Sequence, residues 1–174
     1  MSRRLAREAA FKALFQVDVG NIEPGKALKY SLEDLTLTSE EVTFAGELFR
    51  GAINVMDELN STIKEHLVRW ELDRIAAVDR CLLRLAIYEI LHRPDIPPAV
   101  TINEALELGK KFSEPDSVSF INGVLDKRKS CDRGRFSNCR TNKKTARELS
   151  LRQGTVLKLS QKHKVAVKSR AFIF

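Results

Sequence analysis

Apolar residues recur at intervals of three and four along the first 127 positions of the chain. This is the spacing of one buried face of an α-helix, whereas a half-buried strand would alternate at two. All five prolines lie in the same stretch and divide it into segments. The pattern therefore predicts an all-α fold of six or seven helices.

Two helices are expected before residue 36. The first covers residues 3–19, with Ser2 as its N-cap and Gly20 as its stop. A short second helix follows Pro24 and ends near residue 35. The apolar stripe that the first helix should bury comprises Phe11, Leu14 and Phe15.

A capping-box pattern predicts the start of the longest helix. Thr38 and Glu41 have the required spacing, and the apolar periodicity that follows continues without a gap to residue 63. The period falters near residues 70–73, and a further helix is expected over residues 75–90. Apolar residues flank that helix on a second side, so it should be the most buried one.

The same capping-box spacing occurs twice more. Thr101 with Glu104 predicts one helix start, and Ser113 with Asp116 predicts another. Pro115 would then lie in the first turn of the last helix, where its missing N–H costs little.

Charge is divided unevenly along the chain. Residues 1–127 carry 16 Lys and Arg against 21 Asp and Glu, whereas residues 128–174 carry 14 against 2, so that −5 and +12 give the net +7. Apolar periodicity is lost in the second part, which is rich in polar residues. We predict a helical domain over residues 1–127 and a basic, disordered tail over residues 128–174.

Several classes of protein are disfavoured. No apolar run approaches the ~20 residues of a membrane span, and the amino end does not read as a secretory signal, so a cytoplasmic protein is expected. The three cysteines form no C-x-x-C pair, and no phosphate-binding glycine loop or catalytic motif is present. We therefore expect neither an enzyme nor a bound cofactor or metal.

Cations cluster at the amino end of a domain that is otherwise net negative. Arg3, Arg4 and Arg7 lie within little more than one helical turn, and Lys12 continues the cluster. Cations at this end of a helix oppose its dipole, so the cluster contradicts local stability and suggests a function. The guanidinium fork suits phosphate and base edges. A solvated charge run that only aids solubility stays an equal alternative.

A second cluster combines aromatic and polar side chains around the start of the last predicted helix. It contains Phe112, Asp116, Ser117 and Phe120, preceded by two lysines. Single-stranded RNA is bound by stacking bases on aromatic rings and by hydrogen bonds from short polar side chains. The alternative is that both phenylalanines belong to the core and that Asp116 only caps the helix.

Four motifs carry a resemblance to a known family. They are R-R-x-A-R-E-x-A-x-x-A-L-F at the start, LLRLAIYEI at 82–90, VTINEALELGKKF at 100–112 and DSVSFINGVLDK at 116–127. Together they resemble the NusB family of transcription antitermination factors over about residues 3–127. The resemblance implies two small helical bundles, binding of boxA RNA together with NusE, a protein of the small ribosomal subunit, and action on elongating RNA polymerase with other Nus factors.

The resemblance also implies a set of site residues. Asp73 is included on the resemblance alone, and Asp79 lies where the family presents a carboxylate to NusE. The implied RNA contacts are Arg3, Arg4, Arg7, Lys12, Phe15, Asp73, Phe112, Asp116, Ser117 and Phe120.

Alternatives stay open at this point. A helical protein–protein adaptor without specific RNA binding would place the arginines against an acidic partner. The same helical domain also occurs fused to ribosomal RNA methyltransferases, but this chain has no room for the methyl-donor domain. Both monomers and dimers occur in the family, and residues 128–174 match none of its motifs.

Overall fold

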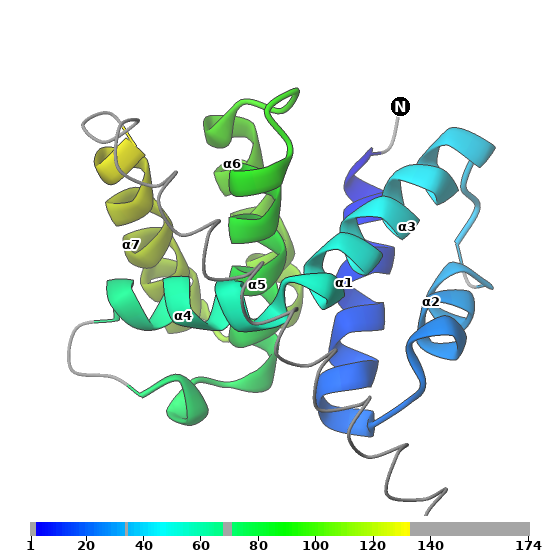
Figure 1. Cartoon of the computed structure of the whole chain (residues 1–174), viewed down its shortest axis with the longest axis horizontal. Helices are drawn as coiled ribbons and strands as arrows, with labels where there is room; N and C mark the ends of the chain where they lie inside the picture. The colour runs from blue at the N-terminus through cyan, green and yellow to red at the C-terminus, as the bar shows by residue number, and fades with distance from the viewer. Residues whose placement is uncertain (1–2, 34, 68–70, 133–174) are drawn as a thin grey trace, which may run out of the picture. The chain divides into compact units, whose positions relative to one another are not determined.

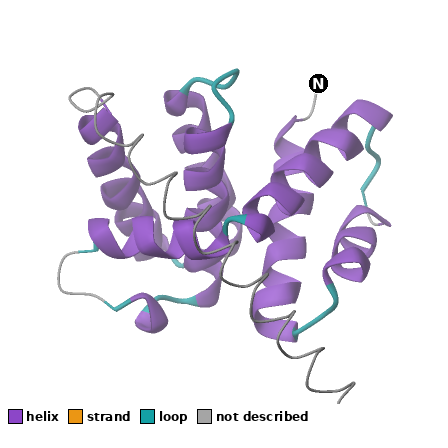
Figure 2. Ribbon diagram, viewed as in Figure 1, coloured by secondary structure: helices purple, strands orange, loops and turns teal. Residues whose placement is uncertain are grey.

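The computed structural model describes residues 3–33, 35–67 and 71–132 (Figure 1). These residues form seven α-helices and one short 3-10 helix, with no strand among them (Figure 2). The predicted all-α class is confirmed. The chain divides into two units, residues 1–131 and 132–174, and the helical bundles belong to the first. Ser2 and most of the predicted tail lie outside the described residues.

The first bundle consists of α1 (Arg3–Gly20), α2 (Pro24–Glu33) and α3 (Ser39–Asn54), which contact one another. Phe11 and Leu14 of α1 are buried in it, whereas Phe15 is partly covered. After Gly20, Asn21 adopts the left-handed conformation with φ 49°, which asparagine tolerates better than most residues.

The second bundle consists of α4 (Met56–His66), the 3-10 helix η1 (Leu72–Arg74), α5 (Ala77–His92), α6 (Pro98–Phe112) and α7 (Pro115–Asp132). Helix α5 contacts α4 and α6, and it also contacts α1 and α3 of the first bundle. Nine of its 16 residues are buried. The predicted pair of bundles is therefore confirmed, as is the prediction that this helix is the most buried one, and α5 joins the two bundles.

The predicted single helix from Thr38 to residue 63 is two helices. Its capping box is present, because the Thr38 side chain accepts from the Glu41 backbone and the Glu41 side chain accepts from the Thr38 backbone. Val55, with φ −118° and ψ 26°, separates α3 from α4. The Leu59 N–H still bonds the Val55 carbonyl at 3.0 Å. A one-residue break leaves the apolar spacing intact, so periodicity could not reveal it.

The other two predicted capping boxes are wrong. Helix α6 begins at Pro98, and the hydroxyl of Thr101, inside the helix, donates to Glu89 of α5. Ser113 ends α6, and its hydroxyl donates to Asp79 of α5 at 2.5 Å. Both hydroxyls therefore satisfy buried carboxylates instead of capping helices. Pro115 does begin α7, as predicted.

A search of the described residues finds no helix both long and apolar enough to cross a membrane.

Candidate nucleic-acid interface

The arginines at the start of α1 have different surroundings. Arg3 is exposed, and its guanidinium carbon lies 5.2 Å from the centre of the Phe44 ring. Arg4 is half exposed and donates two hydrogen bonds to Glu104 of α6, at 3.0 and 2.9 Å. These bonds and the Arg4 charge lower the pKa of Glu104 against the opposing effect of burial. An anion can therefore approach Arg3 more easily than Arg4, whose bonds to Glu104 it would have to replace.

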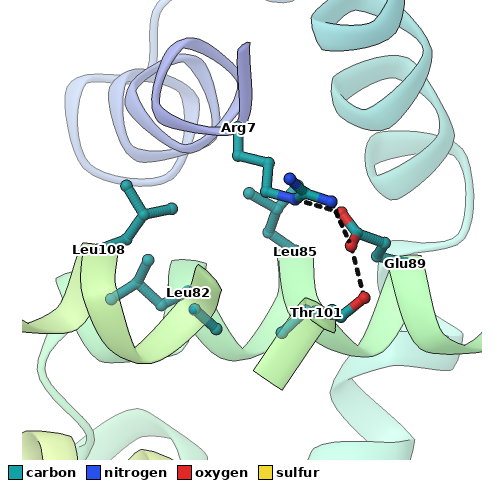
Figure 3. Close-up of a pocket in the computed structure, with 8 residues that line it drawn as sticks. Arg7, Leu82, Leu85, Glu89, Thr101 and Leu108 are labelled. Atoms are coloured by element: carbon teal, nitrogen blue, oxygen red, sulfur yellow. Dashed lines mark hydrogen bonds and ion pairs between the residues drawn. The ribbon is translucent and has the colours of Figure 1, made fainter. Parts of the chain in front are cut away.

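Arg7 is not at the surface, contrary to the prediction. The residue is 5% exposed, and its guanidinium donates two hydrogen bonds to Glu89 of α5, at 2.8 and 2.9 Å (Figure 3). Glu89 is 1% exposed and also accepts from Thr101 of α6. The buried charges satisfy each other and tie three helices together. Arg7 is therefore removed from the candidate interface.

A small interior pocket lies beside this ion pair. Its volume is about 10 Å³, which is far too small for a base or a nucleotide. The pocket in Figure 3 is therefore part of the core packing between the bundles. The residues that line it are Arg7, Leu82, Leu85, Ala86, Glu89, Thr101, Ala105 and Leu108.

Further along α1, two lysines share one buried carboxylate. The ammonium of Lys111, at the end of α6, lies 2.9 and 2.8 Å from the two carboxylate oxygens of Glu8. The ammonium of Lys12 lies 3.0 Å from the same carboxylate. Burial raises the pKa of Glu8, but the hydrogen bonds and charges of the two lysines outweigh it, so that the pKa is lowered. The carboxylate therefore stays ionised between the two cations.

Aromatic rings lie beside these lysines. Phe112 lies 5.2 Å from Phe11, and Phe15 lies 6.4 Å from Phe11, measured between ring centres. Both Lys12 and Lys111 place their ammonium nitrogens near the Phe112 ring, at 5.9 and 5.1 Å from its centre. Phe15 and Phe112 are each partly covered, and both lie beside the buried Phe11.

The remaining residues of the second cluster line a pocket at the start of α7. Asp116, Ser117 and Phe120 form one side of it, and Arg74 and Ile75 belong to the other. The pocket is largely apolar and has a volume of about 350 Å³. Asp116 is exposed, whereas Ser117 and Phe120 are partly covered. Asp73, next to Arg74 in η1, is also exposed.

Asp79 is buried, contrary to its prediction as a partner contact. It was expected to present a carboxylate to a partner protein, but it is 4% exposed and accepts the hydroxyl hydrogen of Ser113. It also lines the pocket at the start of α7. Asp79 therefore holds the α6–α7 turn against α5.

Helix α6 gives the distance between the two predicted clusters. Arg4 is bonded to Glu104, and Phe112 follows eight residues later, about 12 Å along a helix that rises 1.5 Å per residue. The contacts of Lys111 and Lys12 with Glu8 lie between them. The predicted residues of α1 and α6 thus form a band, whereas Asp73, Asp116, Ser117 and Phe120 belong to η1 and α7. The charged members of the band are Arg3, Arg4, Lys12, Lys110 and Lys111, with Glu8, Glu104 and Glu107.

The predicted site lacked Glu8 and Lys111 of the band and Arg74 of the α7 pocket. Glu8 and Lys12 are four apart, and this spacing alone could have revealed their contact. The approach of Lys111 across 103 positions, and of Arg74 to the α7 pocket, depends on how the helices pack. No local pattern carries that information.

The fold and this surface define a class: α-helical proteins of two bundles, with charged and aromatic side chains along a seam between helices. The model of the NusB family matches residues 4–129. The chain belongs to the NusB family, as the sequence motifs predicted.

Similar proteins and solved structures support this family assignment. The transcription antitermination protein NusB of Desulforamulus reducens is 46% identical over 127 residues, which are 73% of this chain and 89% of the relative. The structure of T. maritima NusB matches with a TM-score of 0.68 and 37% identity, covering 73% of this chain and 89% of the other. A complex of the antitermination factors NusB and NusE with double-stranded RNA matches with a TM-score of 0.67 and 29% identity, covering 72% and 96%.

Proposed function

We propose that this chain is a transcription antitermination factor that binds boxA-type single-stranded RNA together with NusE, in the cytoplasm. In this role it acts on elongating RNA polymerase with other Nus factors, by binding and not by catalysis. Membership of the NusB family supports the proposal, and the solved complex of a relative with NusE and double-stranded RNA supports the binding of NusE and of RNA.

The observation that carries the proposal is the pocket at the start of α7. It offers an aromatic ring, a hydroxyl and a carboxylate from Phe120, Ser117 and Asp116, with apolar walls. An unpaired base needs such a combination, because it stacks on rings and hydrogen-bonds through its edges. We assign base contacts to these three residues and to Phe15 and Phe112, with Asp73 at the pocket margin.

We assign phosphate contacts to cations of the band along α1 and α6. Arg3 and Lys12 are available, and Arg4 becomes available when phosphate replaces Glu104. Asp79 contributes to the NusE surface indirectly in this proposal, through the turn that Ser113 and Asp79 hold in place.

The direct test compares boxA-type RNA with a scrambled RNA of the same length and composition. The full chain is used with NusE present. Its 14 basic residues beyond position 127 will bind any polyanion to some degree, so the scrambled RNA measures this background binding at physiological salt. We expect a clear preference for the boxA-type RNA. Equal binding of both RNAs would contradict the proposal and favour an adaptor that binds only proteins.

A further inference from the structure

We infer that Lys12 and Lys111 form a phosphate-binding pair, held in place by Glu8, where the RNA backbone crosses from α1 to α6. The inference rests on the proposed function and adds to it a site of stated chemistry. It also assigns a role to Lys111 and Glu8, which are not among the site residues predicted from the sequence.

The geometry of the three side chains fits an anion site. Lys111 lies within 2.9 Å of both Glu8 oxygens, and Lys12 lies 3.0 Å from one of them. The Glu8 side chain is 5% exposed, whereas those of Lys12 and Lys111 are 35% and 56% exposed. A buried carboxylate therefore fixes two ammonium groups that still face solvent.

Charge is not balanced within this group. One carboxylate meets two ammonium groups, so one positive charge is left over. An ammonium has three donors, and the contacts to Glu8 use only some of them. A phosphate oxygen can take the remaining donors and neutralise the remaining charge.

The neighbouring Lys110 shows what an ordinary surface lysine looks like on this helix. Its ammonium pairs with Glu107 at 2.7 Å, three residues earlier on α6, and Glu107 also lies 3.8 Å from Arg4. Together with Glu104, which Arg4 contacts, this group has two cations and two carboxylates and is balanced in charge. Lys111 differs because it crosses to α1 and lies 5.1 Å from the centre of Phe112, a ring to which we assign a base contact. Lys110 and Lys111 thus form a matched pair for experiment.

The first test measures how RNA affinity depends on salt. The full chain is used with NusE and boxA-type RNA, and Lys111→Ala, Lys12→Ala and Lys110→Ala are compared with the unchanged protein. Each phosphate contact on single-stranded RNA contributes about −0.7 to the log–log slope. We expect Lys111→Ala and Lys12→Ala each to reduce the steepness by about that amount, and Lys110→Ala by much less. Equal slopes for all three variants would overturn the inference.

The second test concerns Glu8 as a positioning residue. Glu8→Gln removes a negative charge, so simple electrostatics predicts tighter binding of every RNA, as for the control Glu107→Gln. If Glu8 fixes the positions of the two ammonium groups, Glu8→Gln should instead lower the ratio of the affinity for boxA-type RNA to that for scrambled RNA. The reason is that ordered phosphate contacts set the position of the RNA strand on the protein. An unchanged ratio would overturn the role of Glu8. Thermal unfolding reports any loss of folded protein separately.

Failure of the phosphate pair and failure of the proposed function give different results. A protein without preference for boxA-type RNA would contradict the proposed function. The phosphate pair would still be supported if RNA affinity depended less steeply on salt in Lys111→Ala than in Lys110→Ala. A clear preference with identical slopes in both variants would contradict only the pair.

Discussion

Two arginines one turn apart in α1 have different surroundings and different roles. Arg3 and Arg7 are four apart and share a helix face, since both guanidiniums lie beside the Phe44 ring at 5.2 and 5.4 Å. Arg3 is nevertheless exposed, whereas Arg7 is buried against Glu89 of α5. The same motif therefore supplies an exposed cation at its start and a buried ion pair one turn later.

Arg7 and Arg4 should differ in their effect on stability. Arg7→Ala leaves the buried Glu89 carboxylate without its ion-pair partner, so we expect a loss of about 3–5 kcal/mol in the free energy of unfolding. Arg4→Ala breaks an exposed pair and should cost less than about 1 kcal/mol. Urea unfolding at neutral pH measures both. Similar losses for the two variants would contradict the assignment of Arg7 to the core.

Asp18 should make stability depend on pH. Burial raises the pKa of this carboxyl, but hydrogen bonds from Arg80 and Arg84 outweigh burial and lower it below its usual 3.8. The unfolded chain therefore takes up the proton first, so the stabilisation is complete well above pH 4 and is lost as the pH falls through the folded-state pKa.

Asp18→Asn should accordingly be less stable at pH 7 and should lose less stability between pH 6 and about pH 3. Unfolding midpoints measured across that range test this, with Glu65→Gln on the exposed face of α4 as the control. A pH dependence in Asp18→Asn as steep as in the unchanged protein would show that other groups are responsible.

At the scale of elements, apolar spacing predicted the helices well because each one buries a single continuous face. It could not separate α3 from α4, since Val55 interrupts the backbone without interrupting that face. The capping boxes show a different limit. Thr38 caps because its surroundings are solvent, whereas Thr101 and Ser113 have the same local spacing but donate to carboxylates of α5. Tertiary contacts decided between equivalent local patterns.

The packing of α3 on α5 requires a glycine at one position. A Cβ on Gly51 would overlap the hydroxyl and ring of Tyr88, which itself stacks on His92. Gly51→Ala should therefore lower the free energy of unfolding by about 1–3 kcal/mol through overpacking, despite the better helix propensity of alanine. A Cβ on Gly123 of α7 would enter open space, so Gly123→Ala should be neutral or stabilising by up to about 1 kcal/mol. Thermal unfolding measures both variants. A Gly51→Ala protein as stable as the unchanged protein would refute the close contact between Gly51 and Tyr88.

At the scale of the whole helical domain, the predicted binding residues form two groups instead of one compact patch: a band along α1 and α6, and the pocket at the start of α7. The motifs contained most of these residues, because exposed cations and an aromatic-polar turn can be recognised locally. The internal pairing of the band could not be predicted, since the contacts of Arg4 with Glu104 and of Lys111 with Glu8 join positions about a hundred residues apart. Those contacts also reduce the net charge of a cluster that looked strongly basic in sequence.

Phe120→Ala tests whether the pocket at the start of α7 binds a base, as we propose. The measurement is the affinity for boxA-type RNA, with NusE present, compared with Tyr30→Ala, which removes an exposed aromatic ring from α2. Stacking of one base contributes about 1–3 kcal/mol, so this affinity should fall by about tenfold in Phe120→Ala and stay unchanged in Tyr30→Ala. An unchanged affinity in a folded Phe120→Ala protein would contradict base binding in this pocket.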